Sequence, residues 1–148
     1  MTNLAIFDIQ VRFYELDPYG HVNHATYLQY FEAARVHWLA AMGQGLDSLQ
    51  AGGTNLVVTR VAVRFVTPAL LNEQLTIETG LITAQRVRAQ WAQAAMRGDD
   101  LVACQRINFA SVSAAGRPVR MPADLIDAMA AFALPEDWRA KELPDLSV

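Results

Sequence analysis

The stretch YELDPYGHVNHATYLQYFEAAR, residues 14–35, contains the change of pattern on which the fold prediction rests. Residues 5–14 alternate between apolar and polar side chains, which is typical of a half-buried strand. The apolar face of this strand would consist of Phe7, Ile9, Val11 and Phe13. From His24 to Met42, apolar side chains instead recur every three or four positions, which predicts a helix with a wide apolar face. Asn23 is a suitable N-cap, because its side-chain oxygen can accept a free amide of the first turn.

Between the predicted strand and helix lies a turn that contains a carboxylate. Asp17-Pro18-Tyr19-Gly20 has the residues preferred at the first, second and fourth positions of a type I turn. Taken alone, Asp17 is most simply a turn residue. One aspartate can nevertheless close a turn and take part in chemistry.

Most of the remaining chain reads as strands, from residue 56 to residue 114. The runs 86–96 and 101–112 flank Arg97-Gly98-Asp99-Asp100, which is suited to a hairpin turn. Residues 46–50 are expected to form one helical turn, and 122–132 a short helix that begins at Pro122. We therefore predict an α+β domain, with a five-stranded antiparallel sheet wrapped around one long central helix. Its open flank favours a homodimer.

Composition limits the classes of function. A chain of 148 residues fits one domain, which we place at 1–134, followed by a polar, loosely held tail at 135–148. No apolar run approaches the roughly 20 residues that span a bilayer, and no secretory signal is expected, so we predict no membrane insertion. The single cysteine, Cys104, excludes an internal disulfide and is ordinary in the cytoplasm, the expected location. A net charge of −3 argues against nucleic acid as a partner.

Asp17, Gly20 and the Tyr27 and Glu32 of the following helix form a pattern that resembles the signature of the 4-hydroxybenzoyl-CoA thioesterase family, including its YbgC-like and long-chain acyl-CoA branches. The resemblance covers roughly residues 6–129. It implies a hotdog fold, a homodimer as the minimal unit and often a homotetramer. It also implies hydrolysis of an acyl-CoA thioester at the subunit interface, with no metal and no organic cofactor.

Within this resemblance, Asp17 matches the catalytic carboxylate, which acts as a nucleophile or as a base toward water. His24 occupies the position whose backbone N–H polarises the thioester carbonyl. Both roles are physically reasonable, because the start of a helix offers free N–H groups and the positive end of its dipole to a developing oxyanion. A carboxylate just before that helix supplies the attacking side.

Each candidate substrate-binding residue has a structural interpretation beside the functional one. His21 and His24 can contact the substrate or orient water, but histidines at a helix start are also common as caps or surface residues. Tyr27 lies nearest the reactive end, although core packing is the simpler interpretation. Guanidinium groups suit phosphate, and the pairs Arg60 with Arg64 and Arg86 with Arg88 each share a strand face. A solvated face explains these pairs equally well. The predicted set is His21, Asn23, Tyr27, Arg60, Arg86 and Arg88.

Two other functions remain open from the sequence. A hydratase or dehydratase would need a histidine and an acidic partner, for which His21 or His24 with Glu32 is the nearest match. A non-enzymatic acyl-CoA binder is the other alternative. Glu32 and Arg35 can equally form a surface ion pair on the helix, and Cys104 is expected to pack inside a strand. The acyl group, and whether coenzyme A or acyl carrier protein delivers it, are not predicted.

Overall fold

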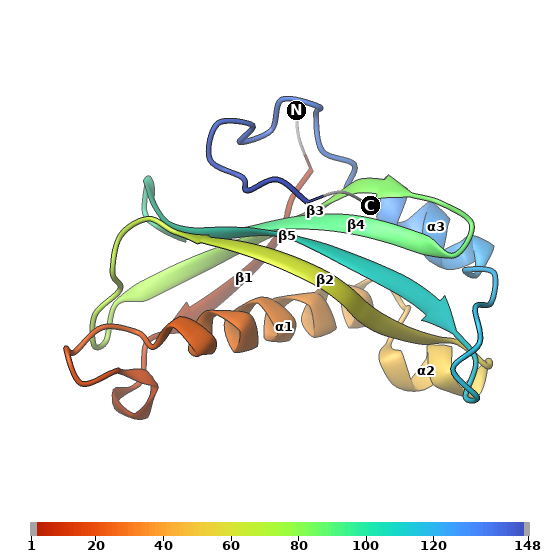
Figure 1. Cartoon of the computed structure of the whole chain (residues 1–148), viewed down its shortest axis with the longest axis horizontal. Coiled ribbons are helices and arrows are strands. Elements are labelled where there is room, and N and C mark those ends of the chain that lie inside the picture. Colours follow the sequence, from red (N-terminus) through yellow and green to blue (C-terminus); the bar gives the residue numbers. More distant parts are fainter. Residues whose placement is uncertain (1–2, 147–148) are drawn as a thin grey trace.

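In the computed structural model, which describes residues 3–146, one five-stranded antiparallel sheet curves around a long helix (Figure 1). The sheet order is β1-β3-β4-β5-β2. Its strands are β1 (Ala5–Gln10), β2 (Asn55–Phe65), β3 (Gln74–Ala84), β4 (Arg88–Arg97) and β5 (Asp100–Val112). The helices are α1 (His24–Ala41), α2 (Leu46–Ala51) and α3 (Ala123–Ala130), with a short 3-10 helix η1 (Phe13–Glu15). This architecture confirms the predicted α+β class.

Helix α1 forms where the sequence predicts it. The Asn23 side-chain oxygen accepts the amide of Ala25 at 2.9 Å, so the N-cap prediction is confirmed. The helix ends just before Gly43, whose φ of 74° is left-handed backbone that favours glycine. Along its sheet-facing side, large side chains are almost fully buried, among them Tyr30, Phe31 and Trp38. Burial of each contributes roughly 1.5–3 kcal/mol, which holds the helix against the sheet.

The first strand is shorter than predicted. It ends at Gln10, and η1 follows, so that Phe13 is 74% exposed instead of continuing the buried face. The placement of Phe13 on that face was therefore wrong. The reason lies in Glu15, which is buried and accepts the amide of Arg12 at 2.7 Å and the hydroxyl of Tyr30 at 2.9 Å. These bonds close the chain into a tight turn. The alternation of apolar and polar residues gives no sign of this turn.

The segment after α3 covers the face of the sheet opposite α1 (Figure 1). Leu143 is buried in an apolar cluster with Cys104, Arg139 forms an ion pair with Glu78 at 2.9 Å, and Arg106 Nε donates to the carbonyl of Pro144 at 2.8 Å. The expectation of a loosely held tail is therefore wrong for residues 135–146; the last two residues of that predicted tail lie outside the described residues. The sequence of this segment is largely polar, and its anchors depend on partners in distant strands that no local pattern indicates.

Strand β2 forms one edge of the sheet and is 11 residues long. Several of its apolar side chains are more than a third exposed; these are Val57, Val58, Val61 and Phe65. Long apolar edges of this kind favour pairing with another strand. Within residues 3–146, no helix combines the length and the apolar character that crossing a membrane requires.

Candidate active site

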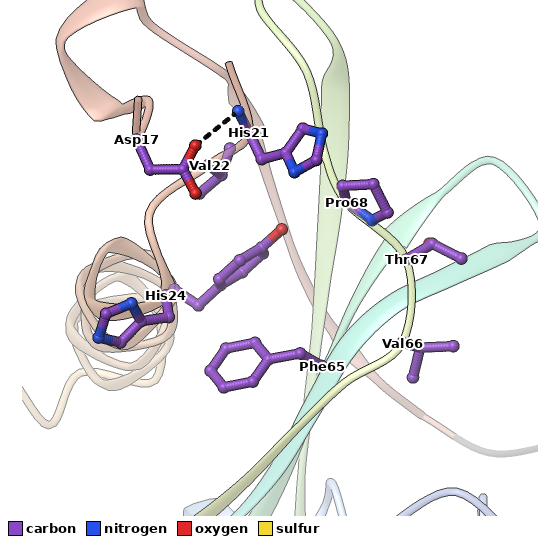
Figure 2. A pocket seen from close by; sticks show the side chains of 9 residues that line it. Asp17, His21, Val22, His24, Phe65, Val66, Thr67 and Pro68 are labelled. Atoms are coloured by element: carbon purple, nitrogen blue, oxygen red, sulfur yellow. Dashed lines mark hydrogen bonds between the residues drawn. The ribbon is translucent and has the colours of Figure 1, made fainter. Parts of the chain in front are cut away.

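A cavity of about 280 Å³ lies at the N-terminal end of α1 (Figure 2). Its wall comes from two parts of the chain: the loop that precedes α1 with the first turns of the helix, and the segment that follows β2. The lining residues are Asp17, His21, Val22, His24, Tyr27, Phe65, Val66, Thr67 and Pro68. Four of the predicted site residues, Asp17, His21, His24 and Tyr27, are therefore brought together.

The segment Phe65–Pro68 was not among the predicted site residues. It is held beside the loop by backbone contacts, because Val22 N donates to the carbonyl of Ala69 at 2.9 Å and His21 forms an isolated bridge with Leu70. These partners are more than forty positions apart in the chain, and no local pattern links them. The only sequence signal was Pro68, which ends an apolar strand.

Asp17 is held by the turn that the sequence predicts. The Gly20 amide donates to the carbonyl of Asp17 at 3.0 Å, and Gly20 has a φ of 79°. Oδ1 of the Asp17 carboxylate accepts the amides of Tyr19 at 2.8 Å and His21 at 3.1 Å. No donor to Oδ2 is found among the described residues, so this half-buried oxygen is available to a ligand in the cavity. Asp17 thus closes the turn and also presents a carboxylate oxygen.

The amides at the start of α1 can be assigned one by one. Ala25 N is taken by the Asn23 side chain, and Thr26 N donates to the Asn23 carbonyl at 2.9 Å. The amide of His24 has no acceptor among the described residues, so it is a free donor at the start of the helix. In Figure 2 the imidazole of His24 points away from Phe65 and Thr67, although His24 is among the residues that line the cavity. Asn23 caps the helix and does not line the cavity.

Tyr27 belongs to the core and to the cavity wall. Its side chain is 4% exposed and its ring lies 5.6 Å from that of Phe65. Burial raises the pKa of the Tyr27 hydroxyl, so this group stays protonated at neutral pH. It presents an apolar ring with a polar tip to whatever enters the cavity.

The predicted phosphate-binding arginines lie elsewhere in the chain. Arg60 and Arg88 line a separate cavity of about 400 Å³ that also includes Asn108. Arg60 lies opposite Asn108 in the pairing of β2 with β5. The residues on either side of Asn108 in β5 belong to the core, so Asn108 points to the other face of the sheet. This cavity therefore opens on the face opposite α1. Arg86 is exposed in the turn before β4 and does not line it. Within one chain, no arginine lines the Asp17 cavity.

Glu32 and Arg35 do not form the surface pair that was one interpretation of the helix. Arg35 is buried and its Nη1 donates to Oε1 of Gln93 at 3.0 Å. Burial lowers the pKa of Arg35 to about 10. Glu32 lines a small slot beside Arg35 and not the cavity of Asp17, so it is not placed to act with His21 or His24. This separation disfavours the hydratase alternative.

Cys104 is fully buried within β5, and burial raises the pKa of its thiol. Its Sγ donates to the carbonyl of Glu142 at 3.4 Å. A buried thiol with a raised pKa is a poor nucleophile. The prediction that Cys104 packs inside a strand is therefore confirmed.

Comparison with known proteins gives consistent matches. The family model described as the thioesterase-like superfamily matches residues 11–129. The acyl-CoA thioester hydrolase YbgC of Escherichia coli O6:H1 is 30% identical over 106 residues, which are 72% of this chain and 70% of YbgC. The long-chain acyl-CoA thioesterase FadM of Escherichia coli K12 is 40% identical over 76 residues, which are 49% of this chain and 54% of FadM.

Among solved structures, a probable thioesterase from Bartonella henselae has a TM-score of 0.77 and 28% identity, and the match covers 81% of this chain and all of that one. Some relatives are covered over a smaller share of their length. The match to the chloroplastic acyl-acyl carrier protein thioesterase ATL3 of Arabidopsis thaliana, at 27% identity, spans 53% of this chain and only 41% of ATL3.

Proposed function

Because the chain belongs to the thioesterase-like superfamily, with the hotdog fold of YbgC- and FadM-like thioesterases, we propose that it hydrolyses an acyl-CoA thioester to the free acid and coenzyme A. The observation that carries this proposal is the placement of the Asp17 carboxylate in one cavity with the start of α1, where the His24 amide has no acceptor among the described residues. A thioester carbonyl between them would meet an attacking group on one side and a donor on the other.

In the proposed reaction, the carbonyl oxygen of the thioester accepts the His24 amide and gains negative charge as the carbonyl carbon is attacked. The partial positive charge at the start of α1 stabilises that oxygen. If Asp17 acts as a base, it takes a proton from water, whose oxygen bonds to the carbonyl carbon. The C–S bond then breaks and the coenzyme A thiolate takes up a proton.

If Asp17 acts as a nucleophile, its oxygen bonds to the carbonyl carbon, the thiolate leaves, and water hydrolyses the resulting anhydride. Label recovered in Asp17 after turnover in oxygen-labelled water supports direct attack. Water that adds to the acyl carbon of the anhydride labels only the acid, as the base route does, so trapping of the acyl group on Asp17 with hydroxylamine separates these two cases.

We place the nucleotide of coenzyme A at Arg60 and Arg88, with exposed Arg86 nearby in sequence, and we propose that a homodimer forms the complete site. Two β2 strands paired antiparallel about their midpoint would set the Phe65 end of one strand beside the start of the other. Phe65 lines the Asp17 cavity, whereas Arg60 lies at the midpoint of β2 on the opposite face. In such a dimer we propose that coenzyme A passes over the paired β2 edge, from the acyl site of one subunit to the arginine cavity on the other face of its partner, so that the complete site lies at the interface. A cytoplasmic location remains part of this proposal.

The proposal is tested by thiol release from a panel of short, long and aromatic acyl-CoA substrates. Turnover of any of them, with the thiol and the acid formed in equal amounts, supports the assignment. If only acyl carrier protein thioesters are cleaved, the coenzyme A site at the arginines is wrong. Binding of acyl-CoA without turnover across the panel would instead favour the non-enzymatic alternative.

A further inference from the structure

Glu15 is a buried carboxylate that does not line the cavity of Asp17, yet it lies only two residues away. It is 8% exposed, and its Oε1 accepts two donors: the Arg12 amide at 2.7 Å and the Tyr30 hydroxyl at 2.9 Å. Its backbone carbonyl accepts the amide of Asn23 at 2.9 Å. One residue therefore joins the start of the loop, the end of the loop and the body of α1.

The partner on α1 is as buried as Glu15. Tyr30 is 1% exposed and lies on the same helix that supplies the His24 amide. Its ring lies 6.0 Å from the ring of Tyr27, edge on, so the Tyr30 hydroxyl has little freedom to move. A buried bond between a carboxylate and a hydroxyl is short and strong compared with a neutral pair. Removal of the Tyr30 hydroxyl would take this bond from Glu15, whose Oε1 would keep the Arg12 amide and whose Oε2 lies 3.5 Å from Nη1 of Arg12.

The loop between Glu15 and Asn23 is held together by backbone contacts, so a shift at its base would also move Asp17. Asp17 N donates to the carbonyl of His21 at 2.7 Å, and Leu16 forms a bridge with Val22, so the two arms of the loop move together. The Asp17 carboxylate is in turn fixed by the amides of Tyr19 and His21. The distance from this carboxylate to the start of α1 is thus set at the base of the loop, where Glu15 meets Tyr30.

Resting on the function proposed above, we propose that Glu15 and Tyr30 are a positioning pair that holds the Asp17 carboxylate at its working distance from the His24 amide. Neither residue touches the substrate. Their contribution falls on the chemical step, because a displacement of about 1 Å between reacting groups can cost up to a hundredfold in rate. Substrate affinity would be largely unaffected, since the arginines proposed to bind coenzyme A lie in another cavity.

The test compares Tyr30→Phe, which removes only the hydroxyl, with Glu15→Gln, which keeps an acceptor oxygen. Tyr30→Phe should lower kcat about tenfold and leave KM within twofold of the parent. The kcat of Glu15→Gln should lie between that of the parent and that of Tyr30→Phe. Glu15→Ala combined with Tyr30→Phe should be no slower than Glu15→Ala alone, because the two side chains act as one unit. Full kcat in Tyr30→Phe would overturn the inference.

Ile107→Val is a matched control, since it truncates a buried side chain in the other half of the core, away from the loop. The comparison requires that Ile107→Val and Tyr30→Phe have the same melting temperature. If Ile107→Val then loses as much kcat as Tyr30→Phe, the loss of kcat reflects lower stability in general, and the inference is overturned.

Amide hydrogen exchange gives a readout that does not depend on activity. Tyr30→Phe should accelerate exchange at the amides of Tyr19 and His21, which are bonded to Asp17, without changing the β3–β4 ladder. Unchanged exchange at these two amides would refute the positioning role. An inactive parent enzyme with accelerated exchange in Tyr30→Phe would instead refute only the thioesterase proposal.

Discussion

Replacement of Asp17 by Asn separates the two roles of this side chain. The amide oxygen of Asn can still accept the amides of Tyr19 and His21, as Oδ1 of Asp17 does. What the variant loses is the negative charge on the oxygen that faces the cavity. We therefore expect a folded protein that binds substrate but cannot generate the attacking group.

The magnitudes follow from these contacts. Loss of a general base typically costs about 10²–10⁴ in rate, which is about 2.7–5.4 kcal/mol in the barrier. Two charge-assisted bonds become neutral ones, which should lower the free energy of unfolding by only about 1–2 kcal/mol. Asp17→Ala, in contrast, leaves the amides of Tyr19 and His21 without this acceptor and should destabilise the loop further.

The assay is thiol release under substrate saturation, with unfolding followed by calorimetry. Asp99→Asn is the matched control, because it makes the same chemical change at an exposed residue of the β4–β5 turn. A rate for Asp17→Asn above a tenth of the parent, or an equal loss in Asp99→Asn, would refute the assigned role. A collapse of the fold in Asp17→Asn would show that the turn, and not the chemistry, depends on the charge.

Four further predictions concern the rest of the molecule. Val61→Glu, on the exposed edge of β2, should convert a dimer to monomers in sedimentation experiments and abolish turnover; an active monomer would contradict the shared site. Arg60→Ala and Arg88→Ala should each raise KM for acyl-CoA several-fold, with a weaker dependence on salt and little change in kcat; an unchanged KM in both would move the nucleotide elsewhere. Burial raises the pKa of the Cys104 thiol, so the unfolded chain gives up this proton at a lower pH than the native chain. The free energy of unfolding should therefore decline as pH rises above the pKa of an unfolded cysteine. The same burial should keep Cys104 unreactive toward thiol reagents until the protein unfolds, which labelling with and without denaturant checks.

The parts of the site that could be predicted from the sequence are those made by neighbours in the chain. Asp17, Gly20 and Asn23 act through a turn and a helix cap, and both devices depend on partners within four residues. The cavity wall at Phe65–Pro68 could not be found in this way, because it reaches the loop through the backbone of Ala69.

Two charged side chains are buried at positions where the sequence alone gives no indication of burial. Arg35 sits at a helical position that suits a surface ion pair, but Gln93, which is 58 positions away, offers it a buried acceptor. Glu15 is buried for the same kind of reason, through the hydroxyl of Tyr30. A carboxylate or guanidinium reads as exposed in the sequence unless its partner is known, and the partner is supplied only by the tertiary structure.

The segment that follows α3 has a practical consequence for handling the protein. The carbonyl of Leu146 accepts Nε2 of Gln90 at 2.9 Å, and Gln90 is bonded in turn to Asn108, a residue of the arginine cavity. Leu146 therefore lies beside the surface proposed to receive the nucleotide. An acidic extension attached to this segment would compete with phosphate groups for the arginines and raise the apparent KM, so kinetic constants should be measured on protein without such an extension.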